Sequence, residues 1–201
     1  MSSVLAVLPG RSAEDAVRAA AGIEGVAGVV VAADLLAGPG PAVIAALAAN
    51  HDVLVLAGLH GDATRAAAAA RRYGEYGAAW VTAQAADGPA LLEAAAASGV
   101  RFLAVTLRHG QGDAEAASIG GRSRGKAVSR LADSAVRAGA EGVLCDLSDL
   151  GVVAQVAPNA SRFVWVDGPA EAIGAARRGA EYVIVDAAVA AETAAAIAGA
   201  A

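Results

Sequence analysis

Histidines and carboxylates stand directly after short apolar runs in this sequence, and such side chains transfer protons near neutral pH. His60 and His109 each precede a glycine, and Asp62 lies two residues after His60. Two imidazoles and a nearby carboxylate suit general acid–base catalysis, because each can accept or donate a proton without a cofactor. We therefore predict His60, Asp62 and His109 as the catalytic residues.

A second set of polar residues at the ends of the apolar runs could bind a substrate. Arg108 suits a carboxylate or an enolate oxygen, because its guanidinium presents several N–H donors in one plane. The remaining members are carboxylates and one amide. We predict that they contact the substrate together with Arg108: Asp34, Gln84, Asp146, Asp167 and Asp186.

Ordinary structural explanations for these residues stay open at this point. Asp62 suits the N-cap of a helix that begins at Ala63. Asp167 precedes a Gly-Pro pair and suits a turn, while Asp146 suits a cap or a solvated strand end. A histidine in a loop is often only solvated, and Arg108 suits the surface or a dimer interface equally well.

A metal site is a further alternative for some of the candidates. His60, Asp62, Asp146 and Asp167 carry the atom types that bind transition metals. Their spacing matches no known ligand pattern, so we predict neither a metal nor a cofactor.

The elements that must position these residues follow from a repeat of strand and helix signals. Each of eight short apolar runs is followed by an alanine-rich helical stretch, and no linker divides the chain. Eight such units predict a single (β/α)8 barrel that comprises residues 1–201, with its site on the loops that follow the strands. The predicted strands are Val4–Leu8, Gly28–Ala32, Val53–Ala57, Ala79–Ala83, Phe102–Thr106, Gly142–Cys145, Phe163–Val166 and Tyr182–Val185.

One segment departs from this repeat. The stretch from Gln111 to Gly125 shows no periodicity and is predicted as a loop, and long loops in compact domains tend to be functional or mobile. A helix is expected from Lys126 to about Ala138. The basic residues at its start favour a solvated helix end, with a cover over the barrel opening as the alternative: Arg122, Arg124, Lys126 and Arg130.

Composition excludes several classes of protein. The chain carries 15 basic and 20 acidic residues, and its formal net charge is −5. No basic stripe with interleaved aromatic residues is present, so we predict no nucleic-acid partner. No apolar run reaches the length of a membrane span. The single cysteine, Cys145, fits core packing in a reducing compartment, and we predict a cytoplasmic protein.

Residues 120–146, GGRSRGKAVSRLADSAVRAGAEGVLCD, carry a family resemblance. They are similar to the helix and sixth strand of the orotidine 5′-monophosphate decarboxylase superfamily, which also contains hexulose-phosphate synthases and keto-gulonate-phosphate decarboxylases. Residues 81–95, 102–107 and 178–183 add shorter matches. The resemblance spans nearly the whole chain, and it implies the barrel and a homodimer.

The functional residues of that family are replaced here. Without a lysine between aspartates, the decarboxylation of that family lacks its proton donor. Without the arginine, a substrate phosphate lacks its bidentate hydrogen bonds. We therefore expect no orotidylate decarboxylation. The family's Asp-x-Lys-x-x-Asp motif falls at Leu56, Gly58 and Gly61, its second-strand lysine near Val30, its first-strand aspartate at Leu8, its fourth-strand histidine at Gln84, its phosphate-binding Gly-Arg at Asp186-Ala187, and the glutamate of its magnesium-dependent branch at Val31.

The sequence thus predicts a repurposed barrel enzyme of this superfamily. It would use acid–base chemistry on a small, non-phosphorylated carbonyl or carboxylate compound, as a lyase, a decarboxylase, an isomerase or a cyclase, in bacterial specialised metabolism. The lyase assignment comes from the resemblance alone. The alternative is a non-catalytic barrel that acts as a binding protein or as an accessory subunit.

Overall fold

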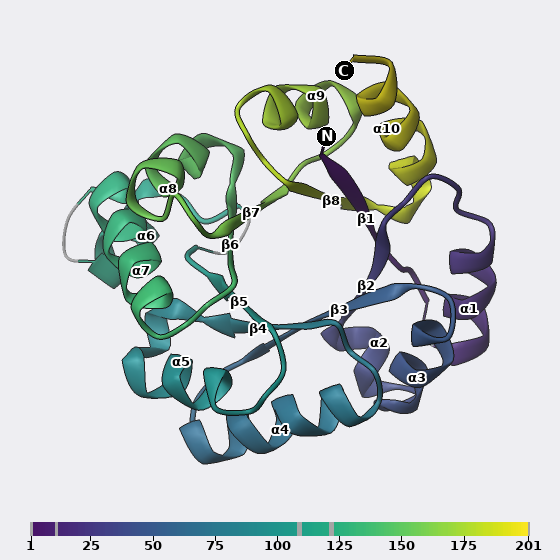
Figure 1. The fold of residues 1–201 in the computed structure, drawn as a ribbon, viewed down its shortest axis with the longest axis horizontal. Coiled ribbons are helices and arrows are strands. Elements are labelled where there is room, and N and C mark those ends of the chain that lie inside the picture. The colour runs from purple at the N-terminus through teal and green to yellow at the C-terminus, as the bar shows by residue number, and fades with distance from the viewer. Residues whose placement is uncertain (1, 11, 108–109, 121–122, 201) are drawn as a thin grey trace.

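A computed structural model of the chain describes residues 2–10, 12–107, 110–120 and 123–200. Within these residues, parallel strands β1 to β8 pair in sequence order, and β8 pairs with β1 to close the barrel (Figure 1). The predicted (β/α)8 barrel is therefore confirmed.

The strands lie within two residues of their predicted positions at both ends. Valine, leucine and alanine dominate them because both faces are covered, by the barrel interior and by the helices. Their bounds are β1 Ser3–Val7, β2 Gly28–Ala32, β3 Asp52–Leu59, β4 Trp80–Gln84, β5 Phe102–Val105, β6 Gly142–Asp146, β7 Ser161–Trp165 and β8 Tyr182–Asp186.

Helices surround the barrel in Figure 1. Short 3-10 turns, η1 and η2, follow β4 and β6 at Ala85–Asp87 and Leu147–Asp149. The bounds of the helices are α1 Ala13–Ala21, α2 Ala33–Ala37, α3 Ala42–Ala48, α4 Ala63–Glu75, α5 Pro89–Ala96, α6 Asp113–Gly120, α7 Arg124–Arg137, α8 Leu150–Val156, α9 Pro169–Arg177 and α10 Ala187–Ala200.

Helix α6 contradicts the prediction of a loop from Gln111 to Gly125. Its start is stabilised by the Glu115 side chain, which accepts a hydrogen bond of 2.8 Å from the Gly112 N–H. Ala116 is fully buried and attaches the helix to the core. Two helical turns are too short to show a 3.6-residue pattern against an alanine-rich background, which is why sequence periodicity missed them.

Inside the barrel, side chains from alternate strands stack in layers of four, as the register of a closed parallel barrel requires. One layer, near the amino-terminal ends of the strands, consists of Gly28, Trp80, Gly142 and Tyr182, and we call it the floor layer. The Trp80 and Tyr182 rings contact edge to face with centroids 5.8 Å apart. The two glycines of this layer allow close approach of the neighbouring strands, because a Cβ on Gly28 would lie 2.5 Å from the Asp52 carbonyl oxygen and one on Gly142 would lie 2.8 Å from that of Ser161.

Four further layers follow toward the carboxyl ends of the strands. The buried apolar residues form two separate clusters, one inside the barrel and one between the strands and the helices, and the large apolar members of these layers belong to the inner cluster. We call the fourth the apolar layer and the fifth the mouth layer. In order, the layers are Leu5, Leu54, Leu103 and Phe163; Val30, Thr82, Leu144 and Ile184; Val7, Leu56, Val105 and Trp165; and Ala32, Gln84, Asp146 and Asp186.

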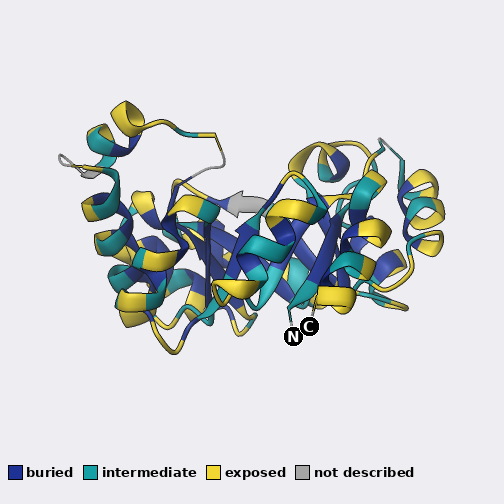
Figure 2. Cartoon of the chain, turned by 90° about the horizontal axis from the view of Figure 1, so that it is seen from above, coloured by how far each residue is buried: buried dark blue, intermediate teal, exposed yellow. Residues whose placement is uncertain are grey.

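The two ends of the barrel differ in what lies on them. Both termini lie at the amino-terminal end, whereas α6 extends beyond the opposite end, at the upper left of Figure 2. The mouth layer and α6 therefore occupy the same end of the molecule. Among the described residues, the helices are all too short or too polar to cross a membrane.

Candidate active site at the carboxyl end of the barrel

The mouth layer brings together three of the predicted substrate-binding residues. Gln84 and Asp146 are half-buried and Asp186 is exposed, while Ala32 completes the layer without a polar group. Directly below lies the apolar layer, which contains the half-buried Trp165. Two carboxylates and an amide above an apolar surface can hold a small polar molecule and exchange protons with it.

Asp186 and Gln84 differ in how far their polar atoms are engaged. Asp186 accepts a hydrogen bond of 3.0 Å from the Ala188 N–H through Oδ1, and so helps to start α10. Within the described part of the chain, no hydrogen bond to the Gln84 amide is found. Both residues therefore retain hydrogen-bonding capacity that a ligand could use.

A bulge in β3 sets the position of His60. The register between β3 and β4 shifts between Val55 and Leu59. Thr82 of β4 donates a weak hydrogen bond of 3.4 Å from its hydroxyl to the Val55 carbonyl, where the shift begins. Bulges are common beside active sites because they redirect the residues that follow. His60 comes directly after this bulge and is exposed.

The carboxylate predicted beside His60 has a structural role. Asp62 is the N-cap of α4, and its Oδ1 accepts a hydrogen bond of 2.9 Å from the Arg65 N–H. The capping alternative is thus observed, and a catalytic role for Asp62 stays a prediction. Asp87 accepts a hydrogen bond of 3.2 Å from the Gly61 N–H, so the loops after β3 and β4 are joined.

Two other predicted residues lie outside the mouth layer. Asp34 is exposed in the first turn of α2, where its Oδ1 accepts a hydrogen bond of 2.9 Å from the Leu35 N–H. Asp167 is exposed two residues beyond β7, and its backbone N–H donates to Glu171 over 3.0 Å. Arg108 and His109 lie outside the described residues, so their predicted roles stay predictions.

Arg124 was not predicted to belong to the site, and the expectation of a solvated helix start is wrong for it. Its side chain is only 18% exposed, and its Nη2 lies 2.7 Å from Asp146 Oδ2. Hydrogen bonds to Asp149 and then to Asp146 raise the pKa of Arg124 above its usual range. A sequence signal existed: a basic first turn is unfavourable beside the positive end of a helix dipole, so it suggests a local anion.

The four named layers below the mouth layer contain no charged side chain. The positions that the sequence resemblance matches to the lysine and the aspartates are apolar on β1 and β2 and at Leu56. Val30 and Leu56 point inward and are apolar. Leu8 and Val31 belong to the outer cluster instead, so the matched positions on β1 and β2 face the helices. Val7 is the inward residue at the end of β1. Among the described residues, no three His, Cys, Asp or Glu side chains form a group that could hold a metal ion.

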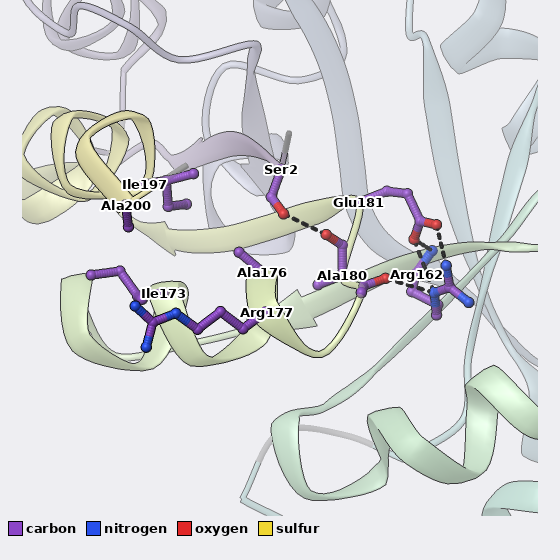
Figure 3. A pocket seen from close by; sticks show the side chains of 10 residues that line it. Ser2, Arg162, Ile173, Ala176, Arg177, Ala180, Glu181, Ile197 and Ala200 are labelled. Atoms are coloured by element: carbon purple, nitrogen blue, oxygen red, sulfur yellow. Dashed lines mark hydrogen bonds and ion pairs between the residues drawn. The ribbon is translucent and has the colours of Figure 1, made fainter.

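A cavity of about 380 Å³ lies at the other end of the barrel, between α9 and α10 (Figure 3). Three of its polar side chains are engaged within the fold: the Ser2 hydroxyl donates to the Ala180 carbonyl over 2.6 Å, and Arg162 pairs with Glu181. Arg162 also donates to the Gly179 carbonyl over 2.7 Å. Because these groups serve the fold, and barrel enzymes place chemistry at the carboxyl ends of strands, we assign the candidate site to the mouth layer.

Comparison with known proteins supports the fold. No protein-family model and no curated protein matches the sequence significantly. Orotidine 5′-phosphate decarboxylase from Lactobacillus acidophilus superposes with a TM-score of 0.86 at 18% identity, covering 100% of this chain and 97% of that one. The corresponding enzyme from Pyrococcus horikoshii OT3 gives 0.84 at 18% identity, with 98% of both chains covered. An uncharacterized conserved protein from Geobacillus kaustophilus gives 0.83 at 21% identity, covering 98% and 99%. The chain shares the complete barrel of these structures.

Proposed function

We propose that this protein is a divergent member of the orotidine 5′-monophosphate decarboxylase superfamily, and an enzyme of phosphate-free acid–base chemistry at the mouth layer. The observation that carries the proposal is the composition of that layer, in which two carboxylates and one amide surround an apolar surface. The substrate class is a small carbonyl or carboxylate compound. The full-length similarity to two decarboxylase structures supports the superfamily assignment.

Charge at the mouth argues against a phosphorylated substrate. Asp186-Ala187 stands where the family resemblance places the phosphate-binding Gly-Arg pair, so Ala187 replaces the arginine and a carboxylate lies directly before it. A carboxylate and a phosphate dianion 4 Å apart repel by about 2 kcal/mol in bulk water, or roughly 30-fold in affinity. Helix starts around the mouth add further acidic residues: Glu14, Asp15, Asp34, Asp113, Glu115 and Glu171.

Each mouth-layer side chain has a distinct role in this chemistry. The Asp186 carboxylate accepts a proton from the carbon beside the substrate carbonyl, and the Gln84 amide donates a hydrogen bond to the oxygen that becomes negative. Asp146 orients the substrate, since Arg124 holds it in place. His60, at the rim after β3, donates its own proton to the carbanionic carbon, and Asp186 and His60 then regain their starting protonation by proton exchange with water. Trp165 below gives the substrate an apolar surface.

Orotidylate decarboxylation is excluded from the proposal by the position of lysine. The single lysine in the sequence, Lys126, is exposed in the first turn of α7. It is therefore outside the inward layers in which a decarboxylase would need its proton donor. We expect no decarboxylation of orotidylate above the uncatalysed rate.

The experiment is solvent-deuterium incorporation, followed by ¹H NMR in D₂O. A panel of 2-oxo acids, 3-oxo acids, ketones and aldehydes is incubated with the protein, and exchange beside the carbonyl is measured. Asp186→Asn is expected to slow exchange by about 10²- to 10⁴-fold, the usual contribution of a general base. Glu192→Gln, on the exposed side of α10, is the control and keeps the wild-type rate. Wild-type exchange in Asp186→Asn refutes the assignment of the base.

A non-catalytic role is the second candidate, and the engagement of the predicted residues favours it. Asp62 caps α4, and Asp146 is paired with Arg124. If compounds of the panel raise the melting temperature without exchanging deuterium, the mouth binds and does not catalyse. We also propose the homodimer that the family resemblance implies; light scattering after size exclusion measures it, and a monomeric mass at micromolar concentration contradicts it.

A further inference from the structure

One guanidinium joins three segments of the chain at the mouth. Arg124 donates from Nε and Nη2 to the two oxygens of Asp149, over 2.8 and 2.7 Å. Its Nη2 also donates to Asp146 Oδ2 over 2.7 Å, and its Nη1 donates to the Gln111 carbonyl over 2.5 Å. Arg124 thus connects the start of α7 with the end of β6, with η2 and with the segment that precedes α6.

The setting of this cluster makes the pairing strong. The Asp149 side chain is only 4% exposed, and the side chains of Arg124 and Asp146 are 18% and 17% exposed. A paired geometry in which two N–H groups meet two carboxylate oxygens is the most favourable for such ions. A cation in the first turn of a helix is otherwise unfavourable, so the two aspartates offset both the dipole and the burial.

A lysine could not make these contacts. The four hydrogen bonds diverge from one planar group toward acceptors on three segments. An ammonium has three donors around one atom and cannot reach all of these acceptors at once. The residue type is therefore dictated by geometry as well as by charge.

We propose that Arg124 is a positioning residue that fixes the Asp146 carboxylate in the mouth layer and fastens the segment carrying α6 to η2, through its bonds to Gln111 and Asp149. The first part rests on the proposed function, since it assigns a purpose to the mouth layer. The second part does not depend on it. Arg124 acts through Asp146 and Gln111, and it need not contact a substrate.

The test uses the full chain without a substrate. Hydrogen exchange of residues 110–120 reports on the fastening of α6. ¹⁹F NMR of protein labelled with 5-fluorotryptophan reports on the mouth, because Trp165 pairs with Asp146 across β6 and β7 while Trp80 lies in the floor layer. Trp165→Phe assigns the two resonances. The control for loss of charge on the same helix is Arg137→Met, which breaks an exposed pair with Asp133.

Arg124→Met is expected to speed exchange in residues 110–120 by about 10- to 100-fold, the effect of losing a charge-assisted hydrogen bond. It should shift the Trp165 resonance and leave that of Trp80 in place. Arg124→Lys should show the same faster exchange. Arg137→Met should match the wild type in both measurements.

Two outcomes overturn the proposal: exchange within twofold of wild type in folded Arg124→Met, or full rescue by Arg124→Lys, which would mean that charge alone suffices. If Arg124→Met does not fold, Asp146→Asn decides, because it leaves the pair with Asp149 intact. Asp146→Asn should then shift the Trp165 resonance and keep α6 protected, and an unshifted resonance refutes the positioning role. Deuterium incorporation, measured separately, tests the proposed function, so the two failures are distinguishable.

Discussion

Replacement of Gly142 by alanine tests the layered packing on which the mouth layer depends. Gly142 belongs to the floor layer, opposite the rings of Trp80 and Tyr182. A Cβ atom there would lie 2.8 Å from the Ser161 carbonyl oxygen and 2.9 Å from both Leu103 Cδ2 and Phe163 Cε2. The first of these is backbone oxygen in the neighbouring strand and cannot rotate away, so β6 and β7 must move apart.

The expected cost follows from this overlap. Overpacking a dense core by one carbon destabilises by about 1–3 kcal/mol. For a chain of this size, 1 kcal/mol changes the melting temperature by about 2–4 °C, so Gly142→Ala should melt roughly 2–12 °C lower. Thermal unfolding followed by circular dichroism, and urea unfolding at 25 °C, measure the change.

Gly174→Ala is the matched control with the opposite sign. Gly174 lies inside α9, and a Cβ there meets no atom within 4 Å. Alanine should therefore stabilise the helix by about 0.5–1 kcal/mol. The double variant Gly142→Ala/Leu103→Ala should lose less stability than the sum of its single variants, because Leu103 is one of the clashing groups. A Gly142→Ala protein as stable as wild type would refute the register of the layers.

Three further predictions concern individual contacts. Hydrogen bonds from Arg101 lower the pKa of Glu141, so this carboxylate stabilises the fold at neutral pH and loses that contribution as the pH falls through its folded pKa. Glu141→Gln should therefore melt up to a few degrees below wild type at pH 7, since a pair exposed by 52% and 38% contributes at most about 1 kcal/mol. The difference should shrink as the pH falls through the folded pKa of Glu141, and a constant difference contradicts this. Burial raises the pKa of Cys145 to about 12. Iodoacetamide at pH 8 should therefore modify this thiol only when urea unfolds the chain. Modification of the folded chain, measured by mass spectrometry, would refute the core position of Cys145. Asp62→Ala should lower the free energy of unfolding by about 0.5–2 kcal/mol, whereas Asp62→Asn keeps the cap and its stability. An equal loss of stability in both variants contradicts capping. Loss of deuterium exchange in the stable Asp62→Asn variant supports a catalytic role.

The apolar runs and the repeat of strand and helix signals predicted the strands well. The second run, Gly28–Ala32, was placed without error, and the others shifted by one or two residues. In three of them a polar residue continues the strand at its end: Gln84, Asp146 and Asp186. A polar residue after an apolar run reads as a loop in the sequence. In a closed barrel, however, it can keep its ladder hydrogen bonds and point into the mouth.

Prediction of the site was less complete. Gln84, Asp146 and Asp186 were placed at one opening because parallel strands end at one edge, and the structure puts them in one layer. Arg124 was assigned to solvent, because a basic helix start gives no sign of which carboxylates lie beside it. Its partners, Asp146 and Asp149, lie 22 and 25 residues further along the chain, after the end of α7.

Local chemistry therefore determined the repeat of strands and helices, and with it the barrel and the end at which polar residues gather. Helix signals and apolar runs act over fewer than about 15 residues, so they can be read from the chain directly. Closure of the barrel decided the rest: which residues share a layer, that Leu8 and Val31 face the helices, and that Arg124 meets Asp146 and Asp149. These facts depend on the stagger between strands and on contacts between distant segments, which exist only once all eight strands are paired.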